Sequence, residues 1–287
     1  MRVLITGAHG QVGRALLATA PPTATIIATG RTELDICDAG AVCAFVADAA
    51  PALILNAAAY TAVDKAEGDE AAALRLNGDA VGILAAAARD CGARLAHIST
   101  DFVFDGAQGS PYAPGATPHP LSAYGRTKLA GERAAGPGAL IVRTSWVYAA
   151  IGGNFVHTML RLMAERDELR VVADQIGTPT LATGIAEALW AMTAQNLAGL
   201  YHFTDSGTAS WYDFAVAIQE EALALGLLSR SIPITPIATA DYPTPARRPA
   251  YSVLDKASTI AALGKAPPHW RANLRRMLGD LVERQAA

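Results

Sequence analysis

The sequence predicts an α/β protein with a doubly wound parallel sheet and a smaller C-terminal lobe. In the first half of the chain, short uninterrupted apolar runs alternate with Ala-rich stretches of helical length. This alternation is typical of a parallel sheet covered on both faces. Near residue 150 the composition of the chain changes, and Pro, Thr and Gly become frequent between the helical stretches. We therefore expect one domain over residues 1–150 and a smaller lobe over residues 151–287, interleaved with the last strands of the sheet.

The expected elements follow one another in a regular order. In the first half, the apolar runs predict strands at Val3–Thr6, Ile26–Thr29, Leu53–Asn56, Leu95–Ser99 and Leu140–Thr144. The stretches between them predict helices at Gln11–Thr19, Ala39–Ala49, Asp69–Asp90 and Ser122–Arg133. The second half predicts a turn at Gln175–Thr180, a strand at Leu200–Phe203, and helices at residues 155–165, up to Asn196, at Ser210–Leu225 and at Trp270–Glu283.

Composition excludes several classes of protein. With 52% hydrophobic and 17% charged residues, the chain has enough apolar side chains for a large core, which argues against disorder. A net charge of −3 argues against non-specific nucleic-acid binding, which needs a basic surface. The longest stretch without Asp, Glu, Lys or Arg, Gly106–Gly125, is rich in Pro and Gly, so we expect no membrane span. The three cysteines form no C-x-x-C pair, which is typical of a cytoplasmic protein, and the scattered histidines predict no metal site.

A glycine-rich loop follows the first expected strand. Residues 6–13 read TGAHGQVG, with Gly7, Gly10 and Gly13 three residues apart at the start of a helix. Glycines in this position let the backbone approach a pyrophosphate and aim the helix N-terminus at it. The alternative is an ordinary Gly-rich turn. The strand–turn–helix context favours a Rossmann-like dinucleotide site, so residues 1–150 are expected to bind a dinucleotide and residues 151–287 its co-substrate.

The end of the second strand bears on the choice of dinucleotide. A site that prefers NAD places an acid there to bind the ribose 2′-hydroxyl. The sequence here is Ala28-Thr29-Gly30-Arg31-Thr32, and the cation of Arg31 suits a 2′-phosphate. We therefore expect NADPH, with NADH as the alternative; Arg31 as a solvated loop residue is the other interpretation.

Tyr124 and Lys128 lie four residues apart on an expected helix, and so share one face. A nearby cation stabilises a phenolate and lowers the pKa of a tyrosine, which then serves as a proton donor to a carbonyl. This spacing is common on surface helices, but the fourth strand ends in Ser99-Thr100-Asp101 at the edge where a carbonyl would bind. We expect Thr100 to contact the substrate oxygen beside Tyr124. Asp101 is either a substrate ligand or a loop cap.

The segments TGAHGQVG, STDFVFDG and YGRTK, in this order, resemble the extended short-chain dehydrogenase/reductase family. Four further segments narrow the resemblance to the branch that reduces dTDP-4-keto sugars: residues 56–67, 143–148, 174–180 and 248–255. The similarity runs over nearly the whole chain. It implies cytoplasmic, NAD(P)H-dependent reduction of the C4 ketone of dTDP-4-dehydro-L-rhamnose to dTDP-L-rhamnose.

The resemblance also implies a set of site residues. Tyr124 is the implied proton donor and Lys128 its partner, with Thr100 and Asp101 beside them. The motifs and the resemblance together give these expected cofactor residues: Gly7, Gly10, Gln11, Val12, Gly13, Arg31, Asp35, Ile36, Ala59, Tyr60, Thr61, Ser99, Tyr124 and Lys128. The implied substrate residues are Thr100, Asp101, Trp146, Asn154 and Arg248. Packing remains an alternative for Trp146, and a helix N-cap for Asn154.

Other functions and assemblies stay open from the sequence. The alternatives are another nucleotide-sugar 4-ketoreductase or epimerase, and a non-catalytic, cofactor-bound regulatory subunit. Some members of the family are dimers bridged by magnesium through acidic residues, one of which would fall near Ala15. That acid is absent, so we expect no metal, and a monomer or homodimer that binds neither nucleic acid nor membrane.

Overall fold

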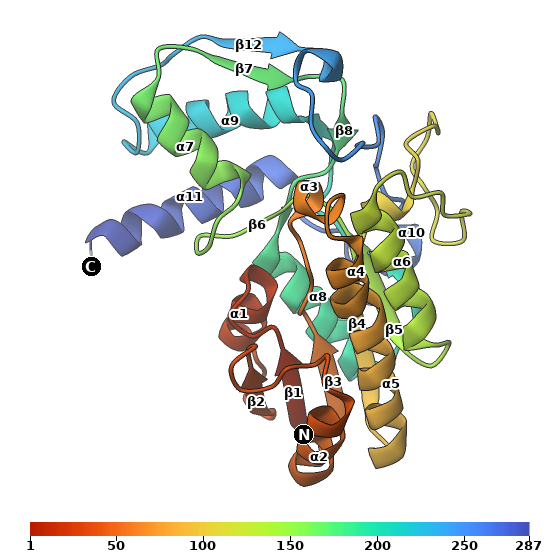
Figure 1. The fold of residues 1–287 in the computed structure, drawn as a ribbon. Helices are drawn as coiled ribbons and strands as arrows, with labels where there is room; N and C mark the ends of the chain where they lie inside the picture. Colours follow the sequence, from red (N-terminus) through yellow and green to blue (C-terminus); the bar gives the residue numbers. More distant parts are fainter. Residues whose placement is uncertain (287) are drawn as a thin grey trace.

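The computed structural model describes residues 1–286 and confirms the doubly wound parallel sheet (Figure 1). Six parallel strands lie in the order β10-β5-β4-β3-β1-β2. Their bounds are β1 Arg2–Thr6, β2 Thr25–Thr29, β3 Leu53–Asn56, β4 Arg94–Thr100, β5 Leu140–Thr144 and β10 Gly199–His202. Because all six run the same way, their carboxyl ends meet at one edge, where open α/β sheets bind ligands.

Helices cover both faces of this sheet, as its apolar strands require. Val3 and Ile5 of β1 face one core, which contains α1 (Gln11–Ala18) and α8 (Ala182–Ala194). Leu4 faces the opposite core, which contains α2 (Ala39–Ala49), α5 (Ala80–Cys91) and the end of α6 (Ala123–Ala135). The alternation of side chains along a strand thus divides the helices between two layers.

The expected helix at 69–90 is continuous but changes its winding. It consists of α4 (Glu70–Leu74), a π-helical turn η1 (Arg75–Asp79) and α5. This helix, Glu70–Cys91, is the one described helix that is long and apolar enough to cross a membrane. Its apolar residues, however, pack in the core with α2 and β3. A π turn inserts an extra residue, and here it places Asn77 in the interior.

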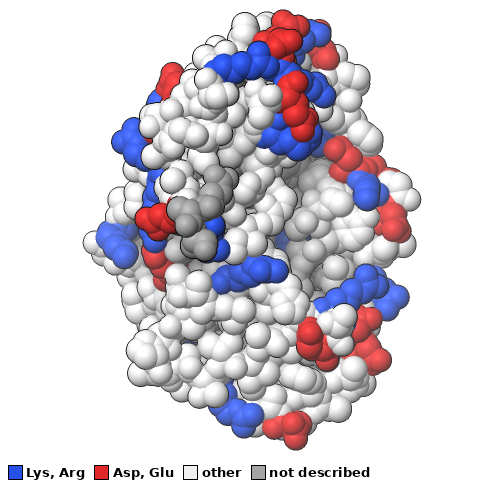
Figure 2. Space-filling view, turned by 90° about the vertical axis from the view of Figure 1, so that its left-hand side faces the viewer, with Lys and Arg blue, Asp and Glu red and all other residues white. Residues whose placement is uncertain are grey.

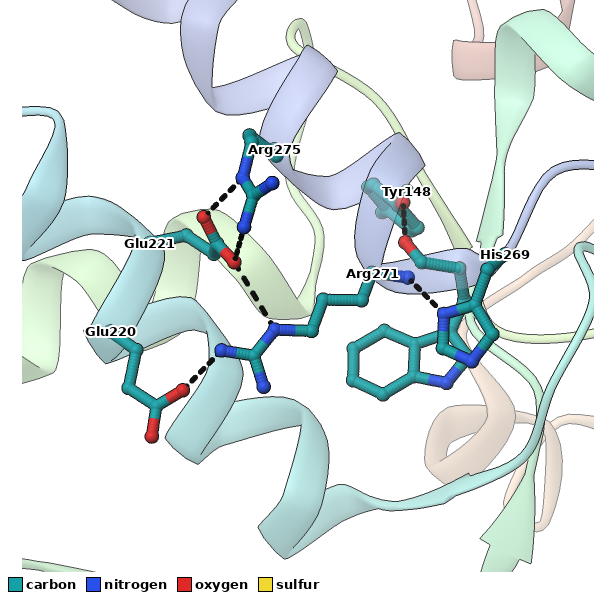
Figure 3. A network of polar contacts seen from close by, with 7 residues as sticks. Tyr148, Glu220, Glu221, His269, Arg271 and Arg275 are labelled. Carbon is teal, nitrogen blue, oxygen red and sulfur yellow. Dashed lines mark hydrogen bonds and ion pairs between the residues drawn. The ribbon is translucent and has the colours of Figure 1, made fainter.

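A third core lies in the C-terminal lobe, above the sheet in Figure 1. Three helices surround it: α7 (Phe155–Glu165), α9 (Trp211–Ala224) and α11 (Trp270–Ala286). A parallel pair, β7 (Leu169–Val172) and β12 (Ile234–Ile237), closes one side. Figure 3 shows how Glu221 of α9 accepts hydrogen bonds from Arg271 and Arg275, which ties α11 to α9.

Short elements join the two lobes. β6 (Val147–Tyr148) pairs with β9 (Thr180–Leu181), and β8 (Ile176–Gly177) pairs with β11 (Ala209–Ser210). The expected turn at Gln175–Thr180 therefore contains two short strands. The remaining elements are α3 (Val63–Ala66), η2 (Asp101–Val103), η3 (Thr239–Asp241) and α10 (Ala257–Leu263). Since α8 and β10 come after residue 150 yet complete the first sheet, the lobes interleave, and the boundary at residue 150 stays a prediction.

Candidate active site

The glycine loop lies at the carboxyl end of β1 with its backbone packed against neighbouring loops. Gly7 has a φ of +68°, and a Cβ there would lie 2.5 Å from the Ala58 nitrogen. A Cβ on Gly13 would lie 2.2 Å from the Gly7 oxygen. Only glycine fits either position, because one has a left-handed backbone and both have no space for a side chain. The loop therefore leaves its backbone open to a ligand at the start of α1.

A cavity of about 800 Å³ opens beside this loop. Its wall includes these expected cofactor residues: Gly7, Gly10, Arg31, Asp35, Ile36, Ala59 and Tyr60. Val12 instead packs against the core beneath the sheet, and Thr61 is exposed just beyond the cavity wall. The lining residues come from the glycine loop, from the segment after β2 and from the loop after β3, so the cavity reaches the carboxyl ends of three neighbouring strands.

The end of β2 carries an acid that the sequence reasoning overlooked. Glu33 accepts a hydrogen bond from the Gly30 amide at 2.7 Å, and this contact together with Thr32 lowers the pKa of its carboxyl group. The carboxylate also lies 3.5 Å from His9 of the glycine loop. Glu33 is therefore engaged by its own loop, whereas Arg31 lines the cavity.

Asn77 positions the loop after β3, and no motif in the sequence predicted it. Its side-chain oxygen accepts from the Tyr60 amide at 2.8 Å, and its nitrogen donates to the Tyr60 carbonyl at 3.1 Å. The same nitrogen donates to the Thr127 hydroxyl of α6. The π turn thus links the cavity wall at Tyr60 to the helix that carries Tyr124.

Tyr124 is the second residue of α6, whose N-cap is Ser122. Its ring packs beside Tyr60 against small alanines and meets Phe102 edge-on, with ring centroids 5.6 Å apart. Desolvation raises the pKa of the Tyr124 phenol to about 12, while the neighbouring Thr100 hydroxyl opposes that rise and Asp101 adds to it. The structure therefore brings Tyr124, Thr100 and Asp101 together as expected, but the expected lowering of the phenol pKa is wrong for the protein without ligands.

Asp101 lies in η2 directly after β4, and its side chain is buried. One carboxylate oxygen accepts from the Thr100 hydroxyl at 3.1 Å; the other, Oδ2, makes no hydrogen bond of good geometry, although the Ser252 side chain lies close enough to lower the pKa of the carboxyl group. Burial raises the pKa of Asp101 to about 6. An unpaired buried oxygen beside a phenol is an acceptor for a ligand hydroxyl, which favours the interpretation of Asp101 as a ligand over a loop cap.

The position of Lys128 shows why the pKa of the Tyr124 phenol is not lowered as expected. Its ammonium group is buried on β4, where Nζ donates to the Ile98 carbonyl at 2.6 Å and lies 3.2 Å from His97 Nε2. Burial lowers the pKa of Lys128 to about 8, although Glu132 opposes this effect. Lys128 is not among the groups that shift the pKa of Tyr124, and its Nζ is bonded to the Ile98 carbonyl of β4.

Ser99 has a different environment from the expected one. Its hydroxyl donates to the Glu132 carboxylate of α6 at 2.5 Å. Glu132 forms two hydrogen bonds of 2.7 Å with Arg143 of β5, in an ion pair that is almost fully buried. The Ser99 side chain thus joins an interior network rather than the cavity, and the network holds α6 against β4 and β5.

Trp146 stacks on Trp211, with ring centroids 3.5 Å apart and planes 6° apart. Its backbone φ is +45°, a strained value for a bulky residue. Trp211 lines a second cavity, of about 630 Å³, between α7 and the β7–β12 pair. The aromatic pair therefore connects the end of β5 to a cavity in the smaller lobe.

Asn154 and Arg248 are both held by protein partners. Asn154 caps α7 by accepting from the His157 amide, as the N-cap interpretation holds, and it donates to Gln11 at 3.0 Å. Arg248 lines the second cavity and forms a salt bridge of 2.8 Å with Asp64 of α3. Gln11 therefore bridges the glycine loop to the smaller lobe, and Asp64 makes a second bridge.

The face turned toward the viewer in Figure 2 is hollowed between the two lobes, with basic and acidic side chains interspersed around it. No group of three or more His, Cys, Asp or Glu within residues 1–286 has a geometry that could hold a metal ion.

Comparisons with known proteins identify the family of this chain. The family described as "RmlD substrate binding domain" matches residues 1–283. The dTDP-4-dehydrorhamnose reductase of Burkholderia thailandensis is 43% identical over 98% of this chain and 99% of its own length. The chain belongs to the dTDP-4-dehydrorhamnose reductase family.

Solved structures of the family have the same fold. That of the Clostridium acetobutylicum reductase has a TM-score of 0.93 and 38% identity, and the match covers 99% of this chain and all of the other. The Bacillus anthracis reductase, solved in complex with NADP, has a TM-score of 0.92 and 35% identity, over 97% and 99% of the two chains. The family resemblance and the fold class predicted from the sequence are thereby confirmed.

Proposed function

We propose that this chain uses NADPH to reduce the C4 ketone of dTDP-4-dehydro-L-rhamnose to dTDP-L-rhamnose. One observation carries the proposal: the hydroxyls of Tyr124 and Thr100 lie together at the carboxyl end of β4, beside β3, whose following loop (Ala57–Tyr60) forms part of the wall of the glycine-loop cavity. A phenol at this edge is placed to protonate a carbonyl oxygen while the carbon receives hydride from a bound dinucleotide. The chain's membership of a reductase family supports the proposed substrate.

The residues around the first cavity fit NADPH. Gly7 and Gly10 line the cavity at the start of α1, where the absence of side chains lets a pyrophosphate approach the backbone, and Arg31 offers a cation for the 2′-phosphate. Asp35 and Ile36 line the expected adenine end, and Ala59 and Tyr60 the middle of the cavity. NADPH, when bound, supplies the hydride. The complex of a relative with NADP supports the same cofactor here.

Tyr124 is the proposed proton donor. Because its pKa of about 12 keeps the phenol protonated at neutral pH, the donor is ready before the ketone binds. Thr100 orients the ketone oxygen, and the unpaired oxygen of Asp101 accepts a hydrogen bond from a sugar hydroxyl. Lys128, four residues after Tyr124 on α6 and buried against β4, is the proposed partner of the phenol, and in its ammonium form it would stabilise the phenolate once the proton has left.

The smaller lobe is proposed to hold the nucleotide. The second cavity combines the indole of Trp211 with the guanidinium of Arg248, a stacking surface and a cation that suit a base and a diphosphate. Trp146, stacked on Trp211, lies between this cavity and Thr100 at the end of β4. Binding energy from the nucleotide then positions the ketone beside Tyr124.

A coupled assay tests the proposal. The dTDP-4-keto sugar is generated with its 3,5-epimerase, and oxidation of NADPH and of NADH is followed separately. We expect stoichiometric consumption of NADPH and formation of dTDP-L-rhamnose. An epimerase would instead retain bound NAD without net oxidation, and a regulatory subunit would show no turnover and would co-purify with another enzyme. Cytoplasmic location and a monomeric or homodimeric state remain predictions.

A further inference from the structure

Four buried polar side chains form a chain that leads from β1 to Lys128. The Thr6 hydroxyl donates to Asn56 Oδ1 at 2.7 Å, and Asn56 Nδ2 lies 3.0 Å from His97 Nδ1. His97 Nε2 lies 3.2 Å from Lys128 Nζ. None of the four residues is more than 2% exposed. They come from β1, β3, β4 and α6, so the chain crosses the sheet beneath the active site.

One backbone amide determines the direction of the hydrogen bonds. The Ala58 N–H, which can only donate, lies 3.1 Å from Asn56 Oδ1. The amide group of Asn56 must therefore turn its NH₂ toward His97, where Nδ1 accepts. A neutral imidazole that accepts at Nδ1 carries its single proton at Nε2. This tautomer directs an N–H at Lys128.

This tautomer of His97 affects the protonation of Lys128. An ammonium group is only a donor, whereas a neutral amine has a lone pair that accepts the N–H of His97. Protonated Lys128 thus faces a second donor at 3.2 Å. Moving the His97 proton to Nδ1 would place it against the NH₂ of Asn56. Rotating Asn56 would in turn leave the Ala58 N–H without its acceptor.

We infer that His97, oriented by Asn56, is a positioning residue that disfavours the ammonium form of Lys128 and brings its ionisation toward the working pH of the enzyme. The role of Lys128 in catalysis rests on the proposed function, but the tautomer of His97 does not. A lysine poised in this way releases and regains a proton more easily than an ordinary lysine during turnover.

The other groups around Lys128 are consistent with this inference. Thr6 and Asn56, from β1 and β3, are uncharged. Glu132, one turn further along α6, raises the pKa of Lys128, but its carboxylate is bound by Arg143 of β5 and by Ser99 of β4. Tyr124 and Asp101 are the titratable groups on the active-site side. Burial and the charge of Lys128 lower the pKa of His97 well below its ordinary value, so His97 stays neutral.

Nitrogen NMR of the full-length protein labelled with ¹⁵N-histidine tests the tautomer directly. We expect His97 to be neutral with its proton at Nε2. His202 is the matched control, because it is also fully buried but its Nδ1 faces the Asp255 carbonyl at 3.1 Å and must donate. The two histidines should therefore show opposite tautomers, with His97→Gln and His202→Gln assigning the signals. A proton at Nδ1 of His97, or a protonated ring, would overturn the inference.

The pH dependence of kcat/KM tests the effect on Lys128. In His97→Gln the side-chain carbonyl can accept from an ammonium, so the alkaline limit should rise by about one pH unit, a tenfold change in proton affinity. Asn56→Asp should shift it in the same direction, since a carboxylate draws the His97 proton to Nδ1. His202→Gln should leave it in place. An unmoved limit in His97→Gln and Asn56→Asp, with both variants folded by circular dichroism, would contradict the inference. If the wild type does not reduce the ketone, the proposed function is wrong. The NMR result would still decide the inference about the tautomer of His97.

Discussion

The indole of Trp146 occupies the space that a side chain on Gly177 would need: a Cβ at position 177 would lie 2.6 Å from Trp146 Cε2. The glycine is in β8 of the smaller lobe, and the tryptophan follows β5 of the main sheet. Their contact, together with the stack on Trp211, holds Trp146 in a strained backbone conformation. This arrangement sets the orientation of the aromatic ring that stacks on Trp211 in the wall of the second cavity.

Replacing Gly177 with alanine should displace Trp146. We expect the free energy of unfolding to fall by about 1–3 kcal/mol from overpacking. The KM for the dTDP-sugar should rise while the KM for NADPH stays nearly constant, because the cofactor cavity is remote from Gly177. Gly138→Ala is the control, since a Cβ there meets no atom within 4 Å. Equal KM values for the sugar in Gly177→Ala and wild type would show that Trp146 does not contact it.

Replacing Tyr124 with phenylalanine should remove most of the activity. The variant keeps the ring and its edge contact with Phe102 but lacks the donated proton, so kcat should fall by about 10²–10⁴-fold. Binding of NADPH, measured by fluorescence titration, should change little. Unchanged turnover would eliminate Tyr124 as the proton donor.

Replacing Arg31 with alanine should weaken the preference for NADPH. A charge-assisted hydrogen bond contributes about 1.5–3 kcal/mol, so the KM for NADPH should rise about tenfold or more. The KM for NADH, which has no 2′-phosphate, should stay nearly the same. Steady-state kinetics with both cofactors measure the ratio, and an equal effect on the two would refute this role of Arg31.

Replacing Glu132 with glutamine should destabilise the fold strongly. The change leaves the Arg143 guanidinium buried without its counter-charge, which costs about 3–5 kcal/mol. Urea unfolding measures the loss. Glu165→Gln is the matched control, since its pair with Arg161 is exposed and contributes about 0.5 kcal/mol or less. Similar losses of unfolding free energy in the two variants would mean that the buried Glu132–Arg143 pair stabilises the fold no more than an exposed pair.

Asp205 should make the stability depend on pH. Burial raises the pKa of its carboxyl group from 3.8 to about 7. Between these values the folded protein binds a proton that the unfolded chain has lost, so stability should fall as the pH rises from about 4 to 7. Thermal unfolding at pH 5 and pH 8 should show this loss in the wild type and a smaller one in Asp205→Asn. Asp167→Asn, at an exposed site, is the control and should lose as much thermal stability between pH 5 and pH 8 as the wild type. An equal loss in Asp205→Asn and the wild type would contradict the prediction.

Much of the fold was predictable because its signals are local. The helix Ala39–Ala49 and the strands Leu53–Asn56 and Leu140–Thr144 have the expected bounds. Apolar runs and helical periodicity report directly on which side chains must be buried. The glycine loop was equally readable, since only glycine adopts its backbone at Gly7.

The candidate site was predictable in its residue types but less so in its contacts. The spacing of Tyr124 and Lys128 placed both on α6, yet it did not reveal that Lys128 would bond to the Ile98 carbonyl. Asn77 was missed because a π turn leaves no clear mark in the sequence. The partners of Arg248 were hidden too, since Asp64 lies 184 residues away along the chain.

By itself, then, the sequence determined the order of strands and helices, the phosphate loop and the pairing of a tyrosine with a lysine on one helix face. Only the tertiary structure decided the pKa values of Tyr124, Asp101 and Lys128, and the direction of the hydrogen bonds through His97. The physical reason is that desolvation and hydrogen bonding depend on which atoms surround a group. Those atoms come from strands and helices that are distant in the chain.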